Sequence, residues 1–189
     1  MACSGTCSCT EAESLSYTDA TTNILGIDLV SDDDFPCDLF QFYFGLPRTS
    51  YELVKGYSKV ISNCDTLDEN SSGIYWVSGP ECRVNSNTIV GSKDNPVLLI
   101  TAATLTKFNG GAKLYGVLFV TDVEDPDAEF QSVGTNTVYG SVINDAILGS
   151  YQGTFQVVWA EDVSEKAGNG GGLGSVLGGW SDFHEDWEL

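Results

Sequence analysis

Basic residues are scarce in this sequence, and their scarcity excludes several classes of partner. Eight lysines and arginines stand against 27 aspartates and glutamates among 189 residues, which gives a net charge of −19. A chain this acidic repels nucleic-acid phosphates and anionic membrane surfaces, so we expect neither as a partner. The same acidity is typical of a protein kept soluble in an exposed or saline setting, or of one that binds cations.

The sequence also lacks the usual catalytic motifs. His184 is its single histidine and lies in the last segment, which leaves a Ser-His-Asp or Cys-His centre without a well-placed base. There is no GxSxG, HExxH or P-loop motif. A polysaccharide lyase or hydrolase would need carboxylates gathered on one sheet, and Asp94, Asp122 and Asp145, with Arg83 as the basic group, are the candidates. We predict no catalytic residue and no cofactor, and keep a carbohydrate-active protein as the alternative.

Long apolar runs are absent as well. No stretch reaches the length that crosses a bilayer, and residues 1–20 lack the basic start and apolar centre of a signal peptide. We therefore expect any export signal or membrane helix to lie outside this sequence, or export to follow another route.

Cysteine, in contrast, is well represented. The even number of six favours an extracytoplasmic protein with disulfides, and none of the cysteines forms a CxxC pair; they are Cys3, Cys7, Cys9, Cys37, Cys64 and Cys82. Six cysteines allow 15 connectivities. Cys64 and Cys82 flank the first strand-like repeat, so we predict a disulfide between them; the alternative is that both are separately buried small apolar residues.

A short pattern recurs through the centre of the chain. A strand-like triplet ends in glycine and is followed by an apolar run, with the glycines at Gly91, Gly116 and Gly140. A spacing in the twenties, with β-branched and aromatic residues, is typical of a strand-based solenoid. We predict a mainly β fold: a parallel β-helix of about four to five coils.

One amphipathic helix is predicted before these repeats, over residues 50–62. Thr49 and Glu52 fit a capping box, and the apolar residues that follow recur at helical spacing. The runs at 74–77 and 97–100 are apolar at consecutive positions, so both faces of their sheet should be buried. We expect the helix, with the aromatic cluster at 35–44, to cover the outer face.

The composition divides the chain into three parts. Residues 1–23 form a loose leader that contains cysteines, and residues 24–160 form the single β domain. Residues 161–189 hold a glycine-rich strap and an aromatic tail, which we expect to protect an open end of the solenoid.

The loop at 122–129 is rich in carboxylates. Its calcium candidates, weak because they lack an EF-hand spacing, are Asp122, Glu124, Asp125 and Asp127. The alternative, an exposed charged loop, needs no metal.

Three strings of the sequence resemble one known family. The runs at 94–100 and 110–120, followed by Gly-Gly-Trp-Ser-Asp-Phe at 178–183, are similar to the C-terminal region of PilX-type proteins of type IV pilus assembly, which are minor-pilin-like. The resemblance covers about residues 64–183. It implies a non-catalytic structural or interaction module in pilus assembly or adhesion, anchored through an N-terminal membrane helix that this sequence lacks. The implied partners are other pilus or cell-surface proteins, contacted especially by the loop at 122–129.

Overall fold

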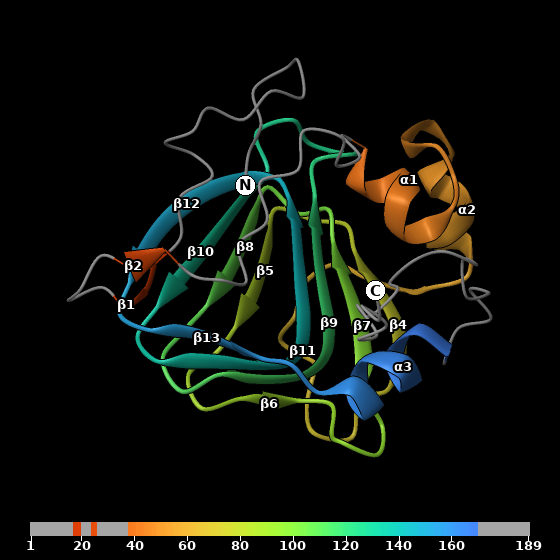
Figure 1. Ribbon diagram of the computed structural model, residues 1–189. Helices are drawn as coiled ribbons and strands as arrows, with labels where there is room; N and C mark the ends of the chain where they lie inside the picture. The colour runs from red at the N-terminus through yellow and green to blue at the C-terminus, as the bar shows by residue number, and fades with distance from the viewer. Residues whose placement is uncertain (1–16, 20–23, 26–37, 170–189) are drawn as a thin grey trace, which may run out of the picture.

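The computed structural model describes residues 17–19, 24–25 and 38–169, and the structural statements below concern these residues (Figure 1). The helices are α1 (Leu39–Phe44), the 3-10 helix η1 (Arg48–Ser50), α2 (Tyr51–Gly56) and α3 (Glu161–Asn169). The strands are β1 (Tyr17–Asp19), β2 (Ile24–Leu25), β3 (Lys59–Ile61), β4 (Gly73–Val77), β5 (Glu81–Val84), β6 (Ile89–Val90), β7 (Val97–Thr101), β8 (Leu105–Phe108), β9 (Lys113–Thr121), β10 (Glu129–Val133), β11 (Asn136–Asp145), β12 (Ile147–Gln152) and β13 (Phe155–Val158).

The fold is mainly β, and its strands lie in two parallel sheets. The larger sheet has seven strands, in the order β13-β11-β9-β7-β4-β3 with β6 paired to β9, and the smaller has the order β12-β10-β8-β5. Strands β1 and β2 form a separate antiparallel pair. The predicted closed β-helix is therefore wrong, because the repeats are divided between two sheets and do not form one continuous solenoid. The sequence pattern predicted parallel strands correctly, but it contained no information on whether the strands close into one solenoid.

Equivalent residues of successive repeats pair with one another. Strand β11 lies beside β9 in an unbroken parallel register that runs from Thr137 opposite Lys113 to Asp145 opposite Thr121. Within that register, Gly140 lies opposite Gly116. The spacing of Gly116 and Gly140 in the sequence is thus the spacing of neighbouring strands, whereas in β7 the residue opposite Gly116 is Val97 and not Gly91.

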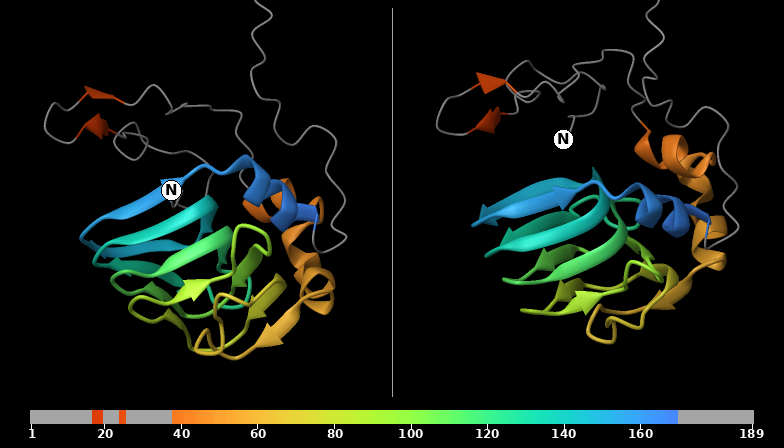
Figure 2. Two further views of the ribbon diagram at one scale, coloured as in Figure 1. Left: turned by 90° about the horizontal axis from the view of Figure 1, so that it is seen from below. Right: turned by 60° about the horizontal axis from the view of Figure 1, so that its bottom comes forward.

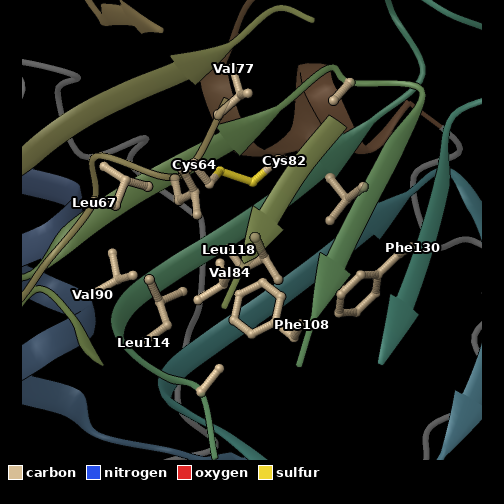
Figure 3. Close-up of a cluster of buried hydrophobic side chains, with 14 of the residues drawn as sticks. Cys64, Leu67, Val77, Cys82, Val84, Val90, Phe108, Leu114, Leu118 and Phe130 are labelled. Atoms are coloured by element: carbon tan, nitrogen blue, oxygen red, sulfur yellow. A yellow bond between two sulfur atoms is a disulfide. The ribbon is translucent and has the colours of Figure 1, made fainter. Parts of the chain in front are cut away.

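The first apolar core lies between the two sheets (Figure 3). Because side chains alternate along a strand, β9 contributes Leu114, Leu118 and Val120 to this core and turns Val117 and Phe119 to the opposite face. The smaller sheet contributes residues such as Phe108 and Phe130, which are almost fully buried. We call this the inner core.

A second core lies on the outer face of the larger sheet. Phe40 and Phe44 of α1 and Val54 of α2 pack there against Trp76 and Phe119, and the helices gather on one side of the strands (Figure 2). Helix α1 begins where the side chain of Asp38 accepts a hydrogen bond from the Gln41 backbone N–H at 2.8 Å, and it ends at Gly45 in the left-handed conformation.

The predicted helix over 50–62 is shorter than expected, and it is not the main helix of the fold. Helix α2 ends at Gly56, and residues 59–61 form strand β3, which pairs with β4. Among the described residues the longest helix is α3, on the C-terminal side, and it packs against the larger sheet through residues such as Ala167. Val60 and Ile61 are β-branched, and pairing with β4 outweighs their helical spacing.

The predicted terminal parts lie largely outside the described residues. This applies to the leader at 1–23, apart from residues 17–19, and to the strap and tail after Asn169. Residues 161–169, which were predicted to belong to the glycine-rich strap, form helix α3.

Candidate functional site

Two of the aligned carboxylates meet at a single arginine. Asp122 follows β9 and Asp145 ends β11, and the register of these strands brings the two positions together. The same nitrogen of the Arg48 guanidinium contacts Asp122 Oδ1 at 2.6 Å and also the Asp145 carboxylate. Because Arg48 belongs to η1, this contact joins the helical cover to the ends of two strands.

Two carboxylates share one guanidinium here, so the cluster carries excess negative charge. Burial raises the pKa of the Asp145 carboxyl to about 6; Arg48 opposes this rise and the nearby Asp122 adds to it. The Asp145 side chain is only 15% exposed. The Asp145 carboxyl therefore binds its proton at a higher pH than an ordinary aspartate does.

Glu124 forms a second contact between the loop and the cover. Its carboxylate accepts hydrogen bonds from Lys55 Nζ at 2.5 Å, from the Trp76 indole N–H at 3.2 Å and from the Ser78 hydroxyl. The hydrogen bond with Glu124 raises the pKa of Lys55. Glu124 thus holds the loop against α2 and β4.

Asp125, a third calcium candidate, has different partners. Asp125 accepts hydrogen bonds from the Thr104 hydroxyl at 2.5 Å and from the Asp127 backbone N–H at 3.0 Å, and the Thr104 bond lowers the pKa of Asp125. Within the described residues, no group of three or more potential ligands converges on one point. The loop does not gather its four acidic candidates into one site, and three of them, Asp122, Glu124 and Asp125, make contacts with side chains outside the loop.

The third carboxylate of the enzymatic alternative lies apart. Asp94 pairs with Lys166 of α3 at 3.7 Å, and Arg83 pairs with its neighbour Glu81. The pair Asp122 and Asp145 is therefore served by Arg48 and not by Arg83. The spacing of the repeats indicated the carboxylate pair, but Arg48 is 97 residues from Asp145, and no pattern in the sequence links them.

The structure contains a disulfide between Cys64 and Cys82, the pair named from the sequence, with 4.8 Å between their Cα atoms (Figure 3). Cys64 and Leu67 are 3% exposed and belong to the inner core together with Cys82 and Val84 of β5. The disulfide therefore holds residues 64–67 against the core next to β5, the edge strand of the smaller sheet. We call this the closed end.

At the opposite end of the sheets, inward-facing apolar side chains are exposed. Strands β12 and β13 are the other edge strands, and their inward positions continue those of β10 and β11: Leu148 lies opposite Phe130, and Val157 lies opposite Val138. Phe130 is 1% exposed and Val138 is fully buried, whereas Leu148 and Val157 are 45% and 49% exposed. The inner core is thus accessible at this end.

We define the open end by the large apolar side chains of β12, of β13 and of the residue after β13 that are more than two-fifths exposed. They are Ile147, Leu148, Tyr151, Val157, Val158 and Trp159. The available signal in the sequence was that the repeats stop after Trp159, without a further strand to bury the last one.

A shallow depression lies on another part of the surface. It measures about 310 Å³ and is lined by Asp68, Glu69, Asn70, Asn87, Thr88 and Ile89. The Asp68 carboxylate accepts a hydrogen bond from the Asn70 backbone N–H at 2.9 Å, which lowers its pKa. This arrangement stabilises the local turn.

Comparisons of the chain with protein-family models, with curated proteins and with solved structures return no match. Among the described residues, no helix is long and apolar enough to cross a membrane. The disulfide is compatible with an extracytoplasmic protein, since such bonds persist in oxidising compartments.

Proposed function

We propose that the protein is a non-catalytic, extracytoplasmic interaction module that binds another pilus or cell-surface protein through its open end. The observation that carries this proposal is the exposure of inward-facing core residues on the last strands. Leu148 and Val157 occupy positions that are buried one strand earlier, and a partner that continues the sheets would bury them in the same way.

The backbone of these strands supports the same function. Strands β12 and β13 are sheet edges, and an edge strand presents unpaired N–H and C=O groups to an added strand. Recognition by strand addition combines such backbone hydrogen bonds with apolar contacts at alternate side chains. The partner that fits is an extended, apolar segment of an extracytoplasmic protein, and the PilX-type resemblance favours a pilus component.

A charged substitution at the open end tests this function in cells. Val157→Lys puts a cation where an apolar partner side chain would pack, so we expect pilus assembly or adhesion to decrease by at least about tenfold. Leu53→Lys is the matched control, because Leu53 is 55% exposed on α2, away from β12 and β13. Unchanged assembly and adhesion in the Val157 variant would contradict the proposal.

The carbohydrate-active alternative rests on Asp122 and Asp145. Two carboxylates held close together, one with a raised pKa, are the groups that a glycosidase uses as base or nucleophile and as acid. In this protein both are bound to Arg48, which restricts their access to a substrate. Turnover in a glycan-cleavage screen that is lost in Asp145→Asn would favour the enzyme over the interaction module.

A further inference from the structure

The loop between β3 and β4 contains an acceptor motif for N-linked glycosylation. Its residues Asn70, Ser71 and Ser72 form the sequence Asn-X-Ser, in which the middle residue is not proline. Asn70 is the only asparagine of the sequence that is followed two positions later by serine or threonine. Such a motif is an acceptor only where it lies in a surface loop of an exported protein, so its place in the fold decides its meaning.

Asn70 lies at the surface, in a turn with a defined backbone. The Ser71 backbone N–H donates a hydrogen bond to the Asp68 carbonyl at 3.1 Å, which closes a tight turn over residues 68–71, and Asn70 is exposed within it. The Asn70 backbone N–H donates to the Asp68 carboxylate at 2.9 Å, whereas the side-chain amide nitrogen Nδ2 is 3.5 Å from the same carboxylate. The backbone is therefore held in place, and the amide is only weakly engaged.

The hydroxyl group that the motif needs is also available. The Ser72 backbone carbonyl accepts a hydrogen bond from Lys59 Nζ at 3.1 Å, but the Ser72 hydroxyl has no hydrogen-bond partner among the described residues. Ser71, in contrast, is 6% exposed, and its hydroxyl is bonded to Asp68. The fold thus buries the middle residue of the motif and leaves the side chains of its first and third residues accessible.

Asn70 is itself part of the wall of the shallow depression described above. The depression, of about 310 Å³, combines amide, carboxylate and hydroxyl groups with one apolar side chain; its lining residues are Asp68, Glu69, Asn70, Asn87, Thr88 and Ile89. A sugar ring has hydroxyl groups along its edge and C–H groups on its faces, so this mixture of groups suits it. The first sugar of a glycan linked to Nδ2 therefore has a surface to pack against.

The motif lies on the side of the closed end. It follows residues 64–67 closely, and the Gly91 backbone N–H donates a hydrogen bond to the Asp68 carbonyl at 2.9 Å. Strand β4, which begins at Gly73, is separated from β13 by β7, β9 and β11. Four strand spacings correspond to roughly 19 Å. A glycan on Asn70 would therefore be attached well away from the open end.

We propose that Asn70 is the acceptor of an N-linked oligosaccharide. The donor is an oligosaccharide carried on a lipid diphosphate. The bond between the anomeric carbon and the diphosphate oxygen breaks, a carbon–nitrogen bond forms to Asn70 Nδ2, and the amide gives up one proton as the lipid diphosphate leaves. The proposal rests on the extracytoplasmic location in the proposed function, and it does not depend on the partner at the open end.

Mass spectrometry of the chain purified from the source organism tests the proposal. We expect the peptide that contains Asn70 to carry an added mass equal to a series of linked sugar residues. Asn70→Gln and Ser72→Ala should each lose this added mass completely, although the second variant keeps the acceptor amide and removes only the hydroxyl. Asn85→Gln is the matched control, because Asn85 is also exposed in a loop but is not followed two positions later by serine or threonine, and it should keep the added mass.

The unsubstituted chain alone gives a decisive result, even if a variant fails to fold. An Asn70 peptide without added mass would overturn the proposal, and so would sugar confined to other residues or added mass that persists in Ser72→Ala. An unmodified Asn70, together with loss of assembly or adhesion in Val157→Lys, would reject the glycan and retain the proposed function. A glycan on Asn70 without any effect of Val157→Lys would do the opposite.

Discussion

Gly140 lies directly beside Gly116 in neighbouring parallel strands, and both adopt a φ of +136°. A Cβ atom at Gly140 would lie 2.0 Å from the carbonyl oxygen of Gly116, and one at Gly116 would lie 1.9 Å from the carbonyl oxygen of Val97. The repeats therefore approach one another backbone to backbone at these positions. This contact explains why the second and third repeats have glycine at these positions.

Substitution of Gly140 should destabilise the protein strongly. Gly140→Ala combines the strain of a positive φ with a backbone clash, so we expect the free energy of unfolding to fall by at least about 3 kcal/mol. Gly56→Ala is the matched control, because a Cβ at Gly56 meets no atom within 4 Å and alanine is the better helix former. Urea unfolding of both variants measures the difference, and a similar midpoint in the two would contradict the account.

The recurring glycines show how far the sequence could predict this fold. Gly116 and Gly140 indicated parallel stacking and the register of β9 and β11, because their backbones are in close contact. Gly91 did not indicate the register of the preceding strand, since Val97 lies opposite Gly116. No sequence pattern indicated the division into two sheets, because a run of consecutive apolar residues is expected both in a β-helix and in two packed sheets. The helix over 50–62 failed for a similar reason: pairing of Val60 with Trp76 of β4 is a non-local contact. The candidate site was predictable to the same extent. The spacing of Asp122 and Asp145 along the repeats could be read from the sequence, whereas their contact with the distant Arg48 could not.

The disulfide should contribute substantially to stability at the closed end. It links residues separated by 18 positions, and a loop of this size corresponds to about 3 kcal/mol in the chain-entropy account. We expect Cys64→Ala, Cys82→Ala to lower the free energy of unfolding by about that amount in urea. The double variant is preferable to a reducing agent, which would act on all six cysteines. An unchanged unfolding midpoint would show that the bond does not hold the closed end.

Asp145 should make stability depend on pH between about 7 and 4. Its folded pKa of about 6 lies above the ordinary value of 3.8, so in this window the folded state binds a proton that the unfolded state does not. The contribution of Asp145 therefore becomes more favourable as the pH falls, by on the order of 1–3 kcal/mol.

Asp145→Asn removes this titration. The stability of the variant relative to the unsubstituted protein should be highest near pH 7.5 and should decrease toward pH 4.5, as measured by urea unfolding at each pH. Asp127→Asn, at an exposed position of the acidic loop, is the control. A constant difference between the Asp145 variant and the unsubstituted protein would contradict the raised pKa.

Calcium should not stabilise the protein through the acidic loop. Asp122, Glu124 and Asp125 are engaged by Arg48, Lys55 and Thr104, so a cation would have to break these contacts. A site with a Kd of about 10 μM would add about 2.7 kcal/mol at about 1 mM calcium. We expect no such change in thermal unfolding with calcium or with a chelator. A rise in Tm that is lost in Asp125→Asn would place a calcium site in the loop.

The central claim is that the open end binds another extracytoplasmic protein, and site-specific photo-cross-linking in cells of the source organism tests it most directly. A photoreactive side chain at Val157 lies at the open end, and one at Glu165 lies on the exposed side of α3. The account predicts a discrete adduct from position 157, identified by mass spectrometry as a pilus or cell-surface protein, and no such adduct from position 165. Adducts of equal yield from both positions, or none from position 157, would contradict it.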